Sequence, residues 1–333
     1  MQKTDYTPIW LMRQAGRYMP EYRKLRERHS IMEIYKTPEL SAQVAALPVE
    51  QFGVDAAILF ADLMTPMEPA GVEFELVENV GPVVRDPIAN AGDVARIRES
   101  VSGELGFVAE AMDVLKGKVG VPVIGFAGGP FTIACYLIEG RRSEGLEGTR
   151  RLMREKPEVW DALMRKLSII VTDYMMMQAG AGADALQLFD TWSGMLGRES
   201  YRRQVMPYTR GIFEELKRRG VKVPLIHFSL DSGAMAGDIA STGCDVVSVG
   251  SMNDINSAWS GMGFRKAIQG NLDPAILEKG GQRMRTAAKR ILDSVNGRPG
   301  HIFNLGHGIL PGTKPENVRE LVELVNSNHR DCI

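Results

Sequence analysis

Residues 121–126 read VPVIGF, a short apolar run rich in β-branched residues. Seven further runs of the same kind recur between longer amphipathic stretches, at residues 8–12, 56–60, 185–189, 223–228, 245–250, 266–270 and 301–306. Each run is almost continuously apolar, which is typical of strands covered on both faces, whereas half-exposed antiparallel strands alternate between apolar and polar residues. The sequence therefore predicts eight strands in one parallel sheet.

The stretches between these runs have helical periodicity, and three of them carry a clear start signal. Thr37-Pro38-Glu39, Lys156-Pro157-Glu158 and Lys314-Pro315-Glu316 each place a proline in what would be the first helical turn. Eight strand and helix units in alternation predict an α/β fold, a (β/α)8 TIM barrel. The main rival, a doubly wound open sheet, would carry GxGxxG after its first strand or a Walker A sequence, and the chain has neither.

The domain organisation is expected to be simple. No internal repeat, low-complexity tract or Pro/Gly/Ser-rich linker divides the chain, so residues 1–333 are interpreted as a single domain. Residues 73–102 are loosely patterned, and we expect them to form a long excursion after the second strand.

Composition excludes several classes of partner. The 333 residues contain 40 basic and 41 acidic side chains, a formal charge of -1, so no overall field recruits nucleic acid or a membrane surface. The three cysteines, Cys135, Cys244 and Cys332, form no CxxC or CxH unit. An odd, scattered set of cysteines argues against a disulfide framework, so we expect a reducing compartment. Residues 1–6 are polar and no long uncharged span follows, so we expect a cytoplasmic protein.

Polar residues follow several of the predicted strands, where TIM barrels place their chemistry. After the first run, Arg13 and Arg17 lie four residues apart with Gly16 between them. Planar guanidinium groups suit bidentate recognition of a carboxylate or phosphate. The alternative is a pair of salt bridges that closes the end of the barrel.

Asp62 follows the second run and has two possible roles. Its carboxylate could accept hydrogen bonds from ligand N–H groups or stabilise a developing cation in a partly dry site. It could also cap the adjacent loop through nearby backbone amides, which is a common use of aspartate at such positions.

His307 lies between Gly306 and Gly308 after the last run, and Tyr136 and Thr191 follow the third and fourth. His307 could serve as a general acid, bind a carboxylate or hold a metal, or it could be a structural histidine. The chain has five histidines but no HExxH and no paired ligand spacing, so we expect no metal site. Tyr136 and Thr191 could each be ordinary hydrogen-bonding residues.

Residues 8–22, PIWLMRQAGRYMPEY, resemble the N-terminal signature of the uroporphyrinogen decarboxylases. Five further stretches resemble the same family in the same order along nearly the whole chain: AILFAD at 57–62, GFAGGPFT at 125–132, FDTWSG at 189–194, QGNLDP at 269–274 and NLGHG at 304–308.

The resemblance implies a distorted TIM barrel that acts as a homodimer and uses no metal and no organic cofactor. It implies stepwise removal of the four acetate carboxyl groups of uroporphyrinogen III to give coproporphyrinogen III, in tetrapyrrole (haem or chlorophyll) biosynthesis. The implied substrate-binding residues are Arg13, Gln14, Ala15, Gly16, Arg17, Asp62, Tyr136, Thr191 and His307. Asp62 would lie beneath the macrocycle and accept its pyrrole N–H bonds.

The same resemblance makes Asp62 and Arg13 the expected catalytic residues. An anion close to the ring nitrogens would stabilise the cationic ring formed during decarboxylation. The proton donor stays open among His307, Tyr136 and water in an arginine-polarised network, because arginine itself is a poor acid.

Two stretches depart from the family pattern. Arg141-Arg142-Ser143 replaces a glycine-rich segment, and HFSLD at 227–231 replaces a run of the type apolar-Phe-Thr-Lys.

Two alternative functions are also considered. A related zinc- or corrinoid-dependent methyltransferase would need soft thiolate ligands, which are missing beside His227. A non-catalytic tetrapyrrole-binding protein would keep the arginine cluster and need Asp62 only as an acceptor.

Overall fold

A curled parallel sheet of seven strands forms the centre of the computed structural model, which describes residues 6–78, 80–230 and 232–328. Each strand of this sheet pairs with the next strand of the same sheet along the chain. The segment that connects two such parallel strands carries helical residues over the sheet. Seven of the eight predicted runs are confirmed as strands. Their bounds in spatial order are β1 Ala57–Ile58, β4 Val123–Gly128, β5 Ala185–Phe189, β6 Leu225–Ser229, β7 Val246–Val249, β8 Ala267–Leu272 and β9 His301–Leu305.

The eighth predicted strand, residues 8–12, differs from the prediction. It forms one isolated parallel bridge, between Ile9 and Phe303 of β9. On its other side, the backbone N–H of Asp55 donates to the carbonyl of Ile9 at 2.8 Å. The run thus spans the gap between β9 and the segment leading into β1, but it is too short for a regular strand because the chain turns at residues 11–14. The structure therefore supports a curled seven-stranded sheet, and the closed eight-stranded barrel is not established by it.

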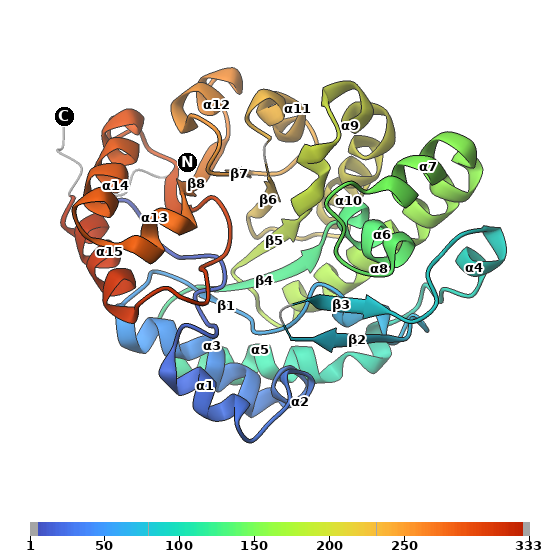
Figure 1. The fold of residues 1–333 in the computed structure, drawn as a ribbon, viewed down its shortest axis with the longest axis horizontal. Helices are drawn as coiled ribbons and strands as arrows, with labels where there is room; N and C mark the ends of the chain where they lie inside the picture. The colour runs from blue at the N-terminus through green and yellow to red at the C-terminus, as the bar shows by residue number, and fades with distance from the viewer. Residues whose placement is uncertain (1–5, 79, 231, 329–333) are drawn as a thin grey trace.

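Helices surround this sheet (Figure 1). The predicted helix starts are confirmed at Pro38, Pro157 and Pro315, each in the first turn of its helix. The bounds are α1 Pro20–Arg26, α2 Ile31–Lys36, α3 Pro38–Phe52, α4 Ala91–Ala95, α5 Gly106–Lys118, α6 Pro130–Glu139, α7 Glu147–Glu155, α8 Pro157–Gly180, α9 Arg198–Gln204, α10 Met206–Arg218, α11 Ala236–Ala240, α12 Ile255–Gly261, α13 Pro274–Lys279, α14 Gly281–Val295 and α15 Pro315–Ser327. None of the described helices has the length and apolar character needed to cross a membrane.

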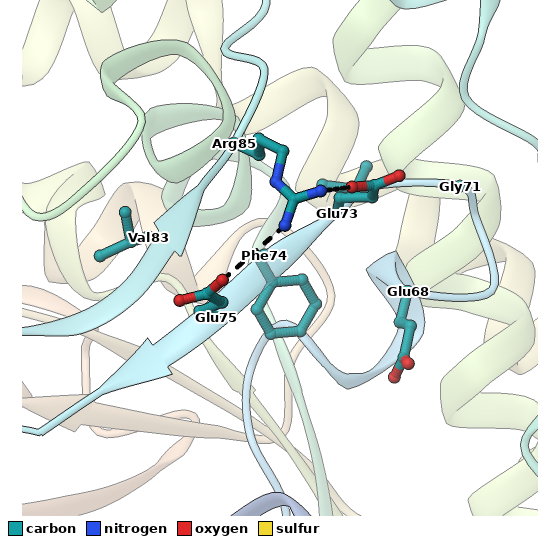
Figure 2. Close-up of a pocket in the computed structure, with 8 residues that line it drawn as sticks. Glu68, Gly71, Glu73, Phe74, Glu75, Val83 and Arg85 are labelled. Atoms are coloured by element: carbon teal, nitrogen blue, oxygen red, sulfur yellow. Dashed lines mark hydrogen bonds and ion pairs between the residues drawn. The ribbon is translucent and has the colours of Figure 1, made fainter.

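The excursion predicted at residues 73–102 contains a β-hairpin that the sequence pattern did not reveal. Strand β2, Phe74–Val77, pairs antiparallel with β3, Gly81–Val84. The guanidinium of Arg85 contacts Glu73 at 2.5 Å and Glu75 at 3.8 Å on the outer side of this hairpin (Figure 2). The hairpin is a separate two-stranded sheet beside the main one (Figure 1).

The interior of the curled sheet is apolar near its rim and polar deeper down. Trp10 donates its indole N–H to Gln269 at 2.9 Å, and the Gln269 amide donates to Gln187 at 3.0 Å and to Ser248 at 2.9 Å. Gln187 lies two residues before the end of β5, so its side chain points to the same face as Phe189, one layer deeper. This buried network fills the interior and provides a floor for any cavity at the carboxyl ends of the strands.

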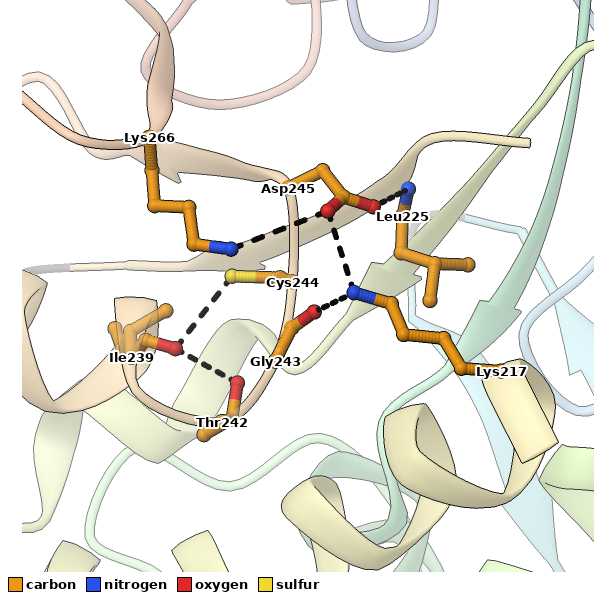
Figure 3. A network of polar contacts seen from close by, with 8 residues as sticks. All are labelled: Lys217, Leu225, Ile239, Thr242, Gly243, Cys244, Asp245 and Lys266. Carbon is orange, nitrogen blue, oxygen red and sulfur yellow. Dashed lines mark hydrogen bonds and ion pairs between the residues drawn. The ribbon is translucent and has the colours of Figure 1, made fainter. Parts of the chain in front are cut away.

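Contacts at the amino ends of β6 and β7 are structural (Figure 3). The carboxylate of Asp245 accepts the Leu225 N–H at 3.0 Å and lies 3.3 Å from the ammonium of Lys217 and 3.9 Å from that of Lys266. Lys217 also donates to the carbonyl of Gly243 at 2.5 Å. These charges are paired with one another and with the backbone, so they stabilise this end of the sheet.

Candidate active site

Two adjoining cavities lie at the carboxyl ends of the strands. The inner cavity has a volume of about 270 Å³ and the outer cavity about 360 Å³. Six residues line both of them: Arg13, Ala15, Phe60, Ala61, Asp62 and Gly81. The shared wall makes the two cavities parts of one cleft.

The inner cavity is largely aromatic. Phe126, Phe189 and Phe228, from β4, β5 and β6, contact one another in sequence with ring centroids 5.5 and 5.9 Å apart. His307 continues the row, 6.4 Å from Phe228 and nearly perpendicular to it. Such a wall suits a ligand that contains rings with apolar faces.

Asp62 lies at the junction of the two cavities. Its carboxylate oxygen Oδ1 accepts the N–H of Met64 at 2.8 Å, and its own N–H donates to the hydroxyl of Thr65 at 3.1 Å. Asp62 therefore caps the turn, and it also lines the cleft, where its role toward a ligand stays a prediction. Burial raises the pKa of this carboxyl, and the bond from Met64 and the charge of Arg13 partly oppose that rise.

Arg13 has a left-handed backbone, with φ of 59°, which is uncommon for a residue other than glycine. Its side chain is open to solvent within the cleft, yet the surrounding wall removes enough water to lower the pKa of the guanidinium. A Cβ atom at Gly308 would lie 2.3 Å from Cδ of Arg13. Glycine at position 308 thus leaves room for Arg13 beside the loop that follows β9.

Gln14 lies apart from the cleft, although its neighbours Arg13, Ala15, Gly16 and Arg17 line it. Its buried side chain accepts the N–H of Leu11 at 3.0 Å and donates to the carbonyl of Ala56 at 2.9 Å. These bonds hold the turn that precedes Arg13, so the geometry gives Gln14 a positioning role. Contact between Gln14 and substrate stays a prediction.

His307 lines the inner cavity. Its Nδ1 accepts the backbone N–H of Gly308 at 2.6 Å, so in the neutral ring the proton is assigned to Nε2. Burial, together with the charges of Arg13 and Arg142, lowers the pKa of His307 to about 4. At neutral pH this histidine is therefore uncharged and can donate a hydrogen bond from Nε2.

Tyr136 and Thr191 line the inner cavity, from α6 and from the segment after β5. The ring of Tyr136 packs 4.6 Å from that of Trp192. Burial and the charge of Asp62 raise the pKa of Tyr136 to about 12, so its hydroxyl stays protonated. The hydroxyl faces β3, since a Cβ atom at Gly81 would lie 4.0 Å from it.

Sequence reasoning missed two further arginines, Arg26 and Arg142, that line the outer cavity. With Arg13 and Arg17 they make four positive groups against the two carboxylates of Asp62 and Glu78, a formal charge of +2. Arg26 is thirteen residues from Arg13 on α1, and no local pattern in the sequence shows that it faces the same cavity.

A second hollow, on the outer face of the hairpin, has the opposite charge. Glu68, Glu73 and Glu75 line it with a single arginine, Arg85, which already contacts two of them (Figure 2). Its formal charge of -2 repels anions, whereas the cleft attracts them. A ligand rich in carboxylates would therefore bind in the cleft.

The geometry also bears on a zinc site. The His227 ring packs against Phe213 of α10, with centroids 5.8 Å apart, whereas its neighbour Phe228 lines the inner cavity. His227 and His307 thus lie on different faces of the sheet and do not share a site. Within residues 6–78, 80–230 and 232–328, no group of three or more His, Cys, Asp or Glu side chains is placed to hold a metal ion. Asp231, at the end of the departing stretch, and Cys332 lie outside the described residues.

A curled parallel sheet with a cationic cleft at its carboxyl ends defines an α/β protein whose cleft, with its aromatic wall, suits anionic small molecules that contain rings. A family model described as uroporphyrinogen decarboxylase (URO-D) matches residues 1–328. The chain belongs to this family.

Individual relatives agree with the family model. The uroporphyrinogen decarboxylase of Chloroflexus aurantiacus is 45% identical over 330 residues, which cover 98% of this chain and 93% of the relative. That of Carboxydothermus hydrogenoformans is 43% identical over 328 residues, with the same coverage.

Two solved structures share the fold at lower identity. A methyltransferase from Methanosarcina mazei has a TM-score of 0.78 and 21% identity, and the match covers 98% of this chain and 95% of that one. A B12-independent methionine synthase from Shewanella has a TM-score of 0.60 and 11% identity, over 98% of this chain and 97% of the other. These likenesses support the fold alone.

Proposed function

We propose that this chain decarboxylates the acetate side chains of uroporphyrinogen III, one after another, to give the methyl groups of coproporphyrinogen III. Family membership over residues 1–328 supports this reaction. The observation that carries it is the position of Asp62, where the aromatic inner cavity meets the outer cavity and its four arginines. A tetrapyrrole has the matching chemistry, since its N–H groups lie at the centre of the ring and its carboxylates at the edge.

The chemistry requires an electron sink. Protonation of the ring carbon next to the one that bears the acetate gives a cationic ring. The C–C bond to the carboxylate then breaks, its electron pair neutralises the ring, and carbon dioxide leaves. Protonation of the resulting exocyclic methylene gives the methyl group, and loss of a proton from the ring carbon restores the pyrrole. Two protons enter and one leaves, so overall one carboxylate is replaced by one hydrogen.

Asp62 would act on this sequence as a fixed negative charge. Its carboxylate accepts the pyrrole N–H bonds and stabilises the cationic ring. Because Met64 already donates to Oδ1, the carboxylate is held in place before the substrate arrives. A charge held in a poorly hydrated position is worth more to a developing cation than one that must first reorient.

The proton source follows from the pKa shifts. His307, with a pKa of about 4, is neutral at physiological pH, and Tyr136, with a pKa of about 12, holds its proton tightly. Neither is matched to proton transfer near pH 7. We propose that the proton comes from bulk solvent through a water molecule bound by Arg13, which gives Arg13 a catalytic role beside Asp62. His307, Tyr136 and Thr191 then bind substrate as hydrogen-bonding groups, and Ala15, Gly16 and Arg17 contact it from the segment that bears Arg13.

The remaining features follow the family. We assign residues 1–333 to one TIM-barrel domain in which residues 8–12 supply the eighth position of the ring, supported by the Ile9 and Phe303 bridge. A homodimer without metal or organic cofactor rests on the resemblance to the family. Cys135 and Cys244 are buried free thiols, which supports a reducing, cytoplasmic environment.

The experiment is anaerobic incubation of the purified protein with uroporphyrinogen III, followed by chromatography of the oxidised products. Porphyrins with progressively fewer carboxyl groups, ending at four, are expected. Unchanged starting material from a protein that nevertheless binds uroporphyrinogen would replace this proposal with that of a tetrapyrrole carrier.

A further inference from the structure

Arg142 lies in the loop between α6 and α7, two residues after the glycine that ends α6. Its side chain is exposed and forms part of the wall of the outer cavity. Among the described residues it has no salt bridge to a carboxylate, although exposed arginines elsewhere, such as Arg165 and Arg218, are paired on their own helices. A guanidinium that faces a cavity without an internal carboxylate can accept one from a ligand.

Arg142 interacts electrostatically with three other residues of the site. Its charge helps to lower the pKa of Arg13 and of His307 and partly opposes the burial that raises the pKa of Tyr136, so the guanidinium lies within range of both cavities. Two regions distant in sequence therefore place positive charge at one cavity: residues 13–26, with Arg13, Arg17 and Arg26, and this loop.

The neighbouring Arg141 differs from Arg142 in its position relative to the cleft. It is exposed, but it lines neither cavity and contributes to none of the three pKa shifts. Two arginines side by side thus separate the effect of general positive charge from the effect of a charge at the rim. The chain supplies its own matched control.

Resting on the proposed function, we infer that Arg142 binds a carboxylate of the tetrapyrrole that is not reacting, and that it is a specificity residue for highly carboxylated substrates. The outer cavity, where Arg142 lies, is separated from the aromatic inner cavity by the shared wall that contains Asp62. When the ring nitrogens face Asp62, side chains at the edge of the macrocycle extend toward the outer cavity. Arg142 therefore acts on substrate binding and leaves the bond-breaking step to Arg13 and Asp62.

The test compares Arg142→Ala with Arg141→Ala in steady-state decarboxylation of uroporphyrinogen III under anaerobic conditions. We expect the KM of Arg142→Ala to rise roughly 3- to 10-fold with kcat nearly unchanged, since one exposed charge-assisted contact is lost. Arg141→Ala should keep the KM of the parent enzyme. Arg142→Lys, which retains the charge but not the planar fork, should recover part of the loss. Added salt should raise the KM of the parent enzyme more steeply than that of Arg142→Ala.

Three outcomes would overturn the inference while leaving the proposed function intact. One is equal KM in the two alanine variants when the parent enzyme is active. Another is a shifted pH profile of kcat in Arg142→Ala at unchanged KM, because the charge would then act on His307 and not on substrate. A third is a folded Arg142→Ala whose KM rises no less steeply with salt than that of the parent. An inactive parent enzyme would instead contradict the proposed function itself.

Discussion

Replacing Asp62 with asparagine should separate its charge from its contact with the backbone. The carboxylate does two things in the structure, since Oδ1 accepts the Met64 N–H at 2.8 Å and the group also faces the cleft. Asparagine has nearly the same shape, and its side-chain oxygen can still accept the Met64 bond. The substitution therefore removes the negative charge and keeps the cap.

The expected effect of Asp62→Asn on kcat is large, and its expected effect on the free energy of unfolding is small. Loss of one preorganised electrostatic contact lowers kcat by about 100- to 1000-fold, or about 2.7–4 kcal/mol of transition-state stabilisation. With the cap retained, the free energy of unfolding should change by less than about 1 kcal/mol. Burial already disfavours the charged form of Asp62, as the raised pKa indicates, so neutralising it carries no additional desolvation cost.

Single-turnover decarboxylation and urea unfolding, on the same preparations, measure the two quantities. Asp62→Ala is the matched control, because it removes both the charge and the cap. It should lose activity like Asp62→Asn and, in addition, about 1 kcal/mol of stability. Near-normal turnover in Asp62→Asn, accompanied by a clear loss of stability, would refute the catalytic role and leave Asp62 as a cap.

Three further predictions concern binding, positioning and pH. Arg17→Ala should raise KM and reduce its salt dependence with little loss of stability, and a variant that unfolds while its folded fraction binds normally would contradict this. Gln14→Leu should lose about 2–6 kcal/mol in urea unfolding, because two buried backbone groups lose their partners at about 1–3 kcal/mol each, and a variant as stable as the parent would contradict this. Burial lowers the pKa of His227 from 6.5 to about 3, so His227 makes the fold less stable as pH falls from 6.5 to 3. Burial raises the pKa of Asp190 from 3.8 to about 6, so Asp190 makes the fold less stable as pH rises from 3.8 to 6. Each slope is about 1.4 kcal/mol per pH unit and the two oppose each other between pH 4 and 6. In urea unfolding, His227→Gln should therefore lose stability with rising pH in this window and Asp190→Asn should gain it, whereas parallel curves for both variants and the parent would contradict the assignment.

The sequence predicted the sheet well because burial on both faces leaves a strong local pattern. Strands β4 to β9 overlap the predicted apolar runs, because helices cover each strand on the outside and packed side chains cover it on the inside. The β2 and β3 hairpin has no such pattern, because β2 alternates between half-buried and exposed residues and packs beside the main sheet. Residues 8–12 have the pattern of a strand, but the turn that follows limits them to one bridge.

The site shows the same division between local and distant information. Residues just after strands were predictable as cleft residues, because parallel strands end at one edge of the sheet. Gln14 shows the limit of that rule, since a turn rotates it away from its neighbours Arg13 and Ala15. Arg26 and Arg142 were not predictable from local pattern, because their positions depend on how α1 and the loop after α6 pack around the cleft.

The bridge between Ile9 and Phe303 also has a consequence for biosynthesis. The two residues are 294 positions apart, so the ribosome adds 294 residues before the first run can meet its neighbour in β9. At roughly 5–20 residues per second, this interval lasts about 15–60 s. During that time Arg13 and Arg17 are already synthesised, but the loop after β9 that completes their cleft does not yet exist. A cleft that contains both walls therefore exists only after residue 308 has been synthesised.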